Sequence, residues 1–315
     1  MKPHCIFVSI ASYRDDMLFF TLNELVSKAR HPDMLRIAVV DQGIEDQRDK
    51  IAALPYAKQI RYVFIHDADT LGVSWARSLA MTLYDEEEWF MQIDSHMYFE
   101  KHWDSSLRSQ IAALLPLSVK PILTTYPYGF EMVDGKAECP IVTSAQVLIL
   151  RPKDDDVLTP TSVTLHFHAK HMTMDEPAVG CHIAGGFIFC SGSLVEEVPY
   201  DPYLYFHGEE QSMAVRAFTR GWDIFHPKVI PMYHLYKKND TPYDSHHWNK
   251  AEEKGRVFSI AYLQGRAKDR LCRLVRGELY GMYGLGNART MEQFKLISGI
   301  DYVANTIENP WGEFK

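Results

Sequence analysis

The tripeptide Asp94-Ser95-His96 constrains the fold of this chain most strongly, because it directly follows the apolar run Trp89–Ile93. A short, continuously apolar run of this kind is typical of a strand that is buried on both faces. Side chains two residues apart in an extended segment share a face, so Asp94 and His96 can point toward the same cation. The pattern predicts a metal site at the end of a buried strand, although short acid-x-His matches also arise by chance.

Apolar runs alternate with helical patterns over the first part of the chain. We expect a helix that Asp15 or Asp16 caps and a second helix over Val73–Tyr84, with strands at Cys5–Ile10, Leu35–Val40, Ile60–Ile65 and Trp89–Ile93. This alternation predicts an α/β fold with a mostly parallel sheet, in which ligands bind outside the carboxyl ends of the strands. Polar residues at four such ends are expected to converge on one crevice: Ser9–Arg14, Asp41-Gln42, His66–Thr70 and Asp94–His96.

The second half of the chain is less regular. The polar, histidine-rich segment Arg151–Gly180 is predicted to be a long functional loop or a lid. Gly185-Gly186 interrupts an apolar run, where glycine usually marks the close approach of a backbone or a ligand. A helix is expected over Gly208–Arg220, and helical structure from about His246 to about Tyr280, followed by loops.

Composition excludes several classes of protein. The 315 residues are 46% hydrophobic and 23% charged, as in a globular protein, and the net charge of −8 argues against a general nucleic-acid binder. The five cysteines are scattered and lack metal-site spacing, so we expect reduced thiols in a cytoplasmic protein. Neither a signal peptide nor an apolar run of membrane-spanning length is recognised.

His234 follows a later apolar run and is a candidate third metal ligand beside Asp94 and His96. Such mixed oxygen and nitrogen donors suit Mn²⁺, and suit Mg²⁺ less well. Arg77 at a helix start can pair with a phosphate, or simply with an acidic neighbour. Glu209 and Glu210 open the helix at Gly208, where the helix dipole favours acids without any function, but they can also orient an acceptor hydroxyl or act as a base.

Two further sets of polar residues can be explained without a role in ligand binding. Asp41 can accept a hydrogen bond from the imide of a nucleobase, although turn-forming Asp is the default interpretation. The histidines of the 151–182 segment match no familiar ligand spacing, and we expect solvated residues or acceptor contacts there rather than a structural metal: His166, His168, His171 and His182.

Together these residues resemble the nucleotide-diphospho-sugar (GT-A) glycosyltransferases, and in particular the cytosolic protein-hydroxyproline N-acetylglucosaminyltransferases and their bacterial relatives. An Asp-Ser-His with a late histidine ligand is also similar to the polypeptide N-acetylgalactosaminyltransferases. The resemblance covers nearly the whole chain and rests on seven segments: Ile10–Asp15, Trp75-Ala76-Arg77, Gln92–Met97, Ala184–Phe187, Gly208-Glu209-Glu210, Tyr283–Thr290 and Ser298–Asp301.

The resemblance implies a GT-A catalytic domain over residues 1–245, with a Rossmann-like donor half (1–120), a less regular acceptor half (121–245) and a helical extension over 246–315 packed on it. It implies a UDP-sugar donor and Mn²⁺ or Mg²⁺ bound by Asp94, His96 and His234. Ser12, Arg14 and Asp41 would lie near the uridine, Arg77 near the diphosphate or sugar, Gly185 and Gly186 beneath the sugar, and Glu209 and Glu210 beside the acceptor. Lys237, Lys238 or Arg289 would close over the diphosphate.

The function that follows is metal-dependent transfer of a sugar, N-acetylglucosamine by preference, to a hydroxyl of a glycan or protein. The resemblance favours retention of configuration, but in an inverting enzyme Glu209 or Glu210 would be the base. Two rivals remain. One is an inactive UDP-sugar-binding module, and the other a non-haem iron oxygenase, which uses two histidines and a carboxylate but typically as His-x-Asp in a β-barrel.

Overall fold

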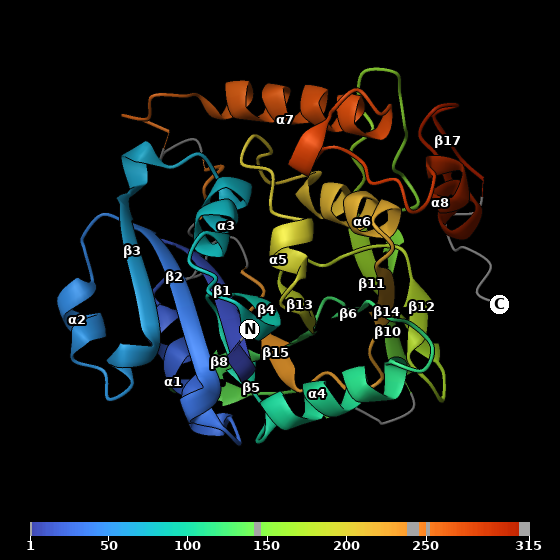
Figure 1. Cartoon of the computed structure of the whole chain (residues 1–315). Coiled ribbons are helices and arrows are strands. Elements are labelled where there is room, and N and C mark those ends of the chain that lie inside the picture. Colours follow the sequence, from blue (N-terminus) through green and yellow to red (C-terminus); the bar gives the residue numbers. More distant parts are fainter. Residues whose placement is uncertain (1, 142–145, 238–245, 250–252, 309–315) are drawn as a thin grey trace.

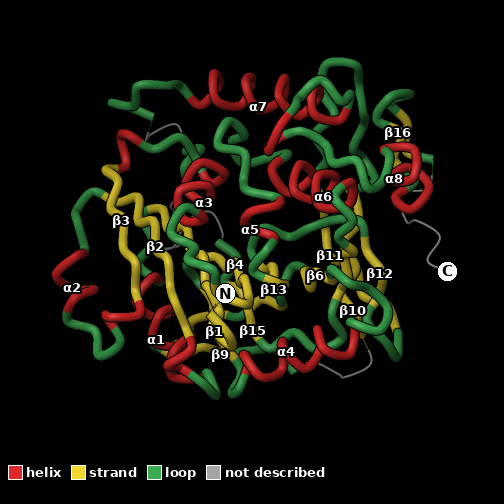
Figure 2. Tube along the Cα trace, viewed as in Figure 1, coloured by secondary structure: helices red, strands yellow, loops and turns green. Residues whose placement is uncertain are grey.

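The computed structural model describes residues 2–141, 146–237, 246–249 and 253–308 (Figure 1). Helices alternate with strands in the first part of the chain, and the longest helix comes late (Figure 2). The helices are α1 (Leu18–Lys28), α2 (Arg48–Ala52), α3 (Val73–Met81), α4 (Trp103–Leu114), α5 (Leu194–Glu197), α6 (Glu209–Thr219), α7 (Ile260–Val275) and α8 (Met291–Ser298).

The strands fall into one large sheet and several small ones. The large sheet contains β1 (Lys2–Tyr13), β2 (Leu35–Gly43), β3 (Ile60–His66), β4 (Glu87–Asp94), β6 (Pro121–Thr124), β12 (Ala178–Gly180), β13 (Phe187–Ser191) and β14 (Asp223–His226). The small sheets contain β5 (Met97–Phe99), β7 (Tyr128–Gly129), β8 (Glu131–Val133), β9 (Lys136–Glu138), β10 (Gln146–Pro152), β11 (Phe167–Thr173), β15 (Met232–His234), β16 (Ile300–Asp301) and β17 (Thr306–Ile307).

The large sheet has the order β12-β14-β6-β13-β4-β1-β2-β3. Strands β4, β1, β2 and β3 are mutually parallel, as the alternation of the sequence predicts, while β13 runs antiparallel between β4 and β6. Because β13 is antiparallel to both of its neighbours, β6 points the same way as β4 and ends at the same edge of the sheet. The predicted α/β fold with a mostly parallel sheet is confirmed.

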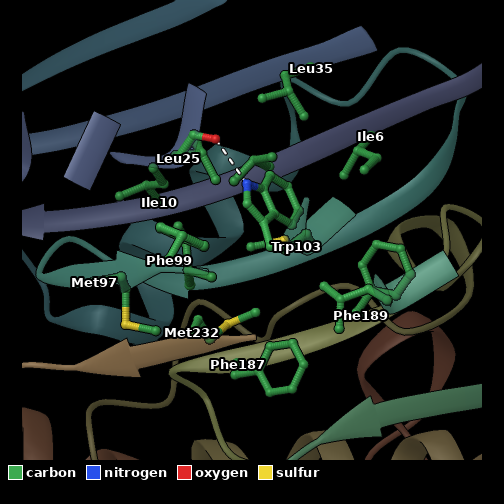
Figure 3. Close-up of a cluster of buried hydrophobic side chains, with 14 of the residues drawn as sticks. Ile6, Ile10, Leu25, Leu35, Met97, Phe99, Trp103, Phe187, Phe189 and Met232 are labelled. Atoms are coloured by element: carbon green, nitrogen blue, oxygen red, sulfur yellow. Dashed lines mark hydrogen bonds between the residues drawn. The ribbon is translucent and has the colours of Figure 1, made fainter. Parts of the chain in front are cut away.

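Helices cover both faces of this sheet, because alternate strand residues point to opposite sides. Ile6, Val8 and Ile10 of β1 face a core shared with α1 and α4, whereas Phe7 faces a core shared with α3, α5 and α6. Figure 3 shows the first core around Trp103, whose indole N–H donates to the carbonyl of Leu25 at 2.9 Å. The two cores hold the sheet rigid between helical layers.

A three-stranded sheet beside the large one brings a distant histidine to the end of β4. Its order is β5-β15-β7, and His234 of β15 lies opposite Met97 of β5. The backbone N–H of Leu235 donates to the carbonyl of His96 at 3.0 Å. Pairing of β15 with β5 therefore places His234 next to the segment that follows Asp94.

Three sequence predictions need correction. The segment Arg151–Gly180 is not one long loop, since β11 pairs antiparallel with β10 and β12 joins the edge of the large sheet. The late region predicted as loops contains α8, which starts with a capping box at Thr290. Helix α1 begins after Met17 without a side-chain cap, so Asp15 and Asp16 do not cap it. The second strand of this pair is polar and largely exposed, so it lacks the apolar signal of a strand.

The late helices pack onto α6. Leu263, Ala267 and Leu271 of α7 share a buried cluster with Val215 and Phe218 of α6. No helix in the described ranges is both long enough and apolar enough to cross a membrane. The division at residue 245 and the cytoplasmic location stay predictions.

Candidate active site

Asp94, His96 and His234 form the one cluster among the described residues in which three such side chains can hold a common metal ion. Each offers one ligand atom, and these atoms all lie within 4.8 Å of one another. The rings of His96 and His234 meet edge to face, with centroids 4.6 Å apart. Nε2 of His234 lies 3.1 Å from Oδ2 of Asp94. The structure thus brings together the three residues that the sequence predicts as ligands.

Asp15 bonds to His96 and Ser95 of this segment. Its Oδ2 lies 2.6 Å from Nδ1 of His96 and accepts a hydrogen bond from Ser95 Oγ at 2.7 Å. Burial alone would raise the pKa of Asp15, but the charges of His96 and Lys237 and the hydrogen bonds hold it well below its usual range. A histidine that donates Nδ1–H to a carboxylate keeps the lone pair of Nε2 for a metal ion, which is the usual arrangement at metal sites.

The electrostatics of the cluster also fit a cation. The hydrogen bond from His234 and the charge of Arg77 hold the pKa of Asp94 well below its usual range, although burial opposes them. Burial lowers the pKa of His234, which favours the neutral imidazole, although the hydrogen bond to Asp94 opposes this. Its Nδ1 is buried without a hydrogen-bond partner. An ionised carboxylate and an imidazole nitrogen are donors that a divalent transition metal accepts.

Arg77 bonds both to Asp94 of the candidate metal site and to Glu209 at the start of α6. Its Nη2 donates to Oδ1 of Asp94 at 2.9 Å, and its Nη1 donates to Oε1 of Glu209 at 2.8 Å. The ring of Tyr200 lies beneath the guanidinium, 5.5 Å from Cζ. Arg77 is only 4% exposed and Glu209 only 3%, so the pair is desolvated and its geometry is fixed by packing.

Glu210 faces another set of partners. Its Oε1 accepts from the backbone N–H of Gly185 at 2.6 Å, and its Oε2 accepts from the hydroxyl of Tyr126 at 2.6 Å. Burial and the neighbouring Glu209 carboxylate raise the pKa of Glu210, while these two hydrogen bonds oppose the rise. Both oxygens of Glu210 are therefore engaged, and the carboxylate anchors the glycine segment.

Gly185 and Gly186 leave no space for a side chain. A Cβ built on Gly185 would lie 2.2 Å from Nη1 of Arg77 and 2.8 Å from Oε1 of Glu209, and one on Gly186 would lie 2.7 Å from Oδ2 of Asp94. The carbonyl of Gly185 also accepts from Nε2 of Gln92 at 2.6 Å. The glycines are required by the close approach of the charged side chains to the backbone.

Most of these groups open onto one cavity of about 670 Å³. It lies at the carboxyl ends of β1, β2 and β4, which contribute Ala11 and Tyr13, Gln42, and Asp94. Arg77, His96, Gly186, Glu209, Glu210, His234 and Lys237 also line it. The predicted convergence of strand ends on one crevice holds for these three strands.

The predicted uridine residues lie at the margin of this cavity. Ser12 and Asp41 are buried opposite each other in the β1–β2 register, and Asp41 accepts from the hydroxyl of Tyr62 at 2.8 Å. Arg14 lies 3.7 Å from Asp67 and turns the chain with a left-handed φ of 44°. Their immediate neighbours Tyr13 and Gln42 line the cavity. Contact of Ser12, Arg14 and Asp41 with a nucleotide stays a prediction.

The three cations expected to close over a diphosphate are placed differently. Lys237 lines the cavity, and its Nζ lies 3.2 Å from Oδ2 of Asp15. Arg289 instead donates to the carbonyl of Trp222 at 3.0 Å and to Asp223 at 2.6 Å, beside a separate small cavity. Lys238 lies outside the described residues.

The sequence reasoning missed Asp15 and Tyr126 as parts of the site. The sequence predicts Asp15 as a helix cap, and the signal that points to the site instead is its place after a strand end in the segment Ile10–Asp15. Tyr126 follows β6, whose direction is set by the antiparallel β13 and is not encoded in a local pattern. His166 and His168 also line the cavity, whereas His182 is buried and its pKa is lowered by burial to about 3.

A family profile described as "Glycosyltransferase (GlcNAc)" matches residues 5–55 and 47–304 of the chain. The match covers nearly all of the described residues and includes every residue of the candidate site. A search of curated protein sequences finds no significant match.

Solved structures resemble the fold at low sequence identity. GalNAc-T7 with UDP, GalNAc and Mn²⁺ aligns with a TM-score of 0.59 and 14% identity over 92% of this chain and 53% of that one. TarS 1-349 of S. aureus aligns with a TM-score of 0.45 and 16% identity over 75% of this chain and 60% of that one. The chain therefore spans between half and two thirds of the length of these structures. The likeness to GalNAc-T7 shows a shared GT-A fold.

Proposed function

The chain belongs to the Glycosyltransferase (GlcNAc) family, and we propose that it transfers a sugar from a UDP-sugar to a hydroxyl of a glycan or protein acceptor in a metal-dependent reaction. The observation that carries this proposal is the cluster of Asp94, His96 and His234 in one cavity with Arg77 and Glu209. A carboxylate with two imidazoles binds a cation, and an adjacent cationic and glycine-lined pocket suits a diphosphate-linked sugar.

In this proposal Asp94, His96 and His234 hold Mn²⁺, which accepts mixed oxygen and nitrogen donors better than Mg²⁺ does. When bound, the cation would supply charge that neutralises the departing diphosphate. Asp15 orients the imidazole of His96 through Nδ1, at 2.6 Å. Lys237, which lines the cavity beside Asp15, adds a second positive charge toward the diphosphate.

Arg77 acts as a positioning residue for both carboxylates. Its fork holds Asp94 on one side and Glu209 on the other, at 2.9 and 2.8 Å. Gly185 and Gly186 let the backbone approach these side chains closely, and in this proposal the transferred sugar lies beside them, where Gly186 lines the cavity. Tyr13 and Gln42 at the ends of β1 and β2 extend the cavity toward the predicted uridine site of Ser12, Arg14 and Asp41.

We favour UDP-N-acetylglucosamine as the donor because the family description names GlcNAc. The GT-A fold shared with GalNAc-T7, whose structure contains UDP, GalNAc and Mn²⁺, supports UDP and Mn²⁺ in the same roles. The donor is tested by measuring UDP release from a panel of UDP-sugars with and without Mn²⁺. Release that needs the metal and is fastest from UDP-N-acetylglucosamine supports the proposal, and metal-independent release refutes it.

We also favour retention of the anomeric configuration. An inverting reaction needs a carboxylate that is available as a base, but Glu210 has both oxygens in hydrogen bonds, and Glu209 is buried with its Oε1 bound by Arg77, which leaves only its buried Oε2. In a front-face reaction an oxygen of the leaving diphosphate takes the acceptor proton, and no protein base is required. NMR of the first-formed product distinguishes the two: an α-linked product from the α-linked donor supports retention, and a β-linked product refutes it.

One of the two alternative functions conflicts with the fold, and the other is tested by the same UDP-release assay. A non-haem iron oxygenase loses its support, because the ligands stand on an α/β sheet of a glycosyltransferase family member. An inactive binding module would bind UDP with Mn²⁺ and release no UDP from any donor in the panel, with or without acceptor.

A further inference from the structure

Five aromatic rings form a continuous series along one wall of the main cavity. This ring wall consists of His166, Phe206, His207, His246 and Trp248. The ring centroids of His166 and His207 are 4.7 Å apart, and those of His207 and Phe206 are 4.9 Å apart. Phe206 and Trp248 follow at 4.3 Å, and His246 stacks on Trp248 at 4.5 Å with an interplanar angle of 15°.

The ring wall adjoins the carboxylates of the site. Phe206 and His207 come directly before Gly208, which starts α6 with a φ of 91°, so they stand next to Glu209 in the chain. His166 is fixed from outside by Asp156, whose Oδ1 lies 2.8 Å from Nδ1 of the imidazole. Three separate segments of the chain thus converge on one aromatic surface beside the proposed transfer site.

A second cavity of about 310 Å³ continues behind this wall. It shares Tyr205, Phe206, His207 and Trp248 with the main cavity and reaches Glu253 and Gln264 beside the start of α7. Its volume lies at the lower end of the ~300–1,000 Å³ that small-molecule sites occupy. Among the described residues that line it there is one carboxylate and one amide, and no lysine or arginine.

This chemistry distinguishes between possible occupants. A phosphorylated acceptor would meet a carboxylate without a compensating cation in the second cavity, which is unfavourable. A sugar ring has an apolar face of C–H groups that packs on aromatic rings, and a rim of hydroxyls that bond to carboxylate, amide and imidazole groups. Trp248 lines both cavities and is 37% exposed although His246 stacks on its ring, so part of the indole is open to a ligand.

We propose that the ring wall and the second cavity form the acceptor subsite and take a neutral sugar of a glycan. This rests on the proposed transferase function. In the transfer, the acceptor hydroxyl oxygen bonds to the anomeric carbon of the donor while the bond from that carbon to the diphosphate oxygen breaks. UDP leaves with the electron pair of that bond, and the hydroxyl proton passes to the departing diphosphate and then to solvent.

The test compares transfer with donor hydrolysis in the full chain. Chitobiose, lactose and maltose serve as neutral acceptors, and glucose 1-phosphate and a hydroxyproline peptide as the other classes, with UDP release and product mass as the readouts. At least one neutral disaccharide should be glycosylated by the wild type. Trp248→Ala should lower kcat/KM for that acceptor roughly tenfold or more, with Trp248→Phe restoring most of it. Donor hydrolysis without acceptor should stay within about twofold in both variants.

Tyr280→Ala is the matched control, because Tyr280 is 86% exposed and stands outside the wall. Saturation-transfer NMR of the accepted disaccharide on the wild type gives a second readout that needs no variant. Glycosylation of only the peptide or the sugar phosphate overturns the acceptor proposal, as does a Trp248→Ala enzyme with unchanged acceptor kinetics. If the wild type neither binds UDP nor hydrolyses any UDP-sugar, the proposed function itself fails, and a working hydrolysis with no neutral acceptor refutes only the subsite.

Discussion

Replacing Gly185 by alanine tests whether the close approach at this glycine matters for the reaction. The new Cβ would lie 2.2 Å from Nη1 of Arg77, 3.0 Å from its Cζ and 2.8 Å from Oε1 of Glu209. Ordinary contact begins near 3.4 Å, so Nη1 must retreat by more than an ångström. Arg77 cannot do so without loosening its bonds to Asp94 or Glu209, because packing fixes it at 4% exposure.

The expected magnitude follows from that displacement. A misplacement of ~1 Å in a catalytic constellation can lower the rate by about 10²-fold, which corresponds to ~2.7 kcal/mol of transition-state stabilisation. Overpacking at a buried position costs ~1–3 kcal/mol of folding stability, so Tm should fall by several degrees while the fold is kept. We therefore expect Gly185→Ala to fold and to lose about two orders of magnitude in kcat/KM.

The assay is Mn²⁺-dependent UDP release together with thermal unfolding of the same samples. Gly265→Ala is the control, since nothing lies within 4 Å of a Cβ at this position of α7. It should raise stability by up to ~1 kcal/mol, through the helix propensity of alanine, and leave UDP release unchanged. A Gly185→Ala enzyme with wild-type kcat/KM would refute the link between the Arg77 bonds and catalysis.

Three other substitutions probe single contacts of the site. Asp94→Ala should abolish Mn²⁺-dependent UDP binding in calorimetry while the circular dichroism spectrum is kept, and unchanged binding would remove Asp94 from the metal site. Asp15→Asn should weaken Mn²⁺ binding about 10–100-fold in electron paramagnetic resonance titrations, because His96 loses its carboxylate partner, and equal affinity would contradict that role. Tyr126→Phe removes a hydrogen bond that favours the ionised form of Glu210, so the pKa of Glu210 should rise further. The acidic limb of the pH–rate profile should then move to higher pH. An unmoved limb would exclude control of this limb by Glu210.

The sequence predicts the parallel part of the fold because its signals are local. Each buried strand of the first part is a mainly apolar run, as in Cys5–Ile10 within β1, and each crossover helix has its own periodicity. The β10–β11 hairpin escaped prediction because its second strand, Phe167–Thr173, is polar and half exposed. Its pairing partner β10 precedes it across an irregular segment, so no short window contains both strands.

The candidate metal ligands could be predicted for the same reason, and their supporting contacts could not. Asp94 and His96 share one strand end, and His234 ends another apolar run. The bonds from Asp15 to His96 and from Tyr126 to Glu210 span 81 and 84 residues, and each depends on strand order. Periodicity predicts which strand ends are polar, but it does not say which side chains meet across the edge of the sheet.

Glu209 and Glu210 look equivalent in the sequence, and the structure separates them. Consecutive helical residues point about 100° apart, so the two carboxylates are directed toward different hydrogen-bond partners. Glu209 turns to Arg77, while Glu210 turns to Gly185 and Tyr126. The helix dipole would favour acids here even on an exposed surface, but it does not explain why Glu209 is buried to 3% exposure beside a desolvated arginine. Burial of such a charge is costly, so the pair is better explained by a site that requires a fixed Arg77 than by helix capping alone.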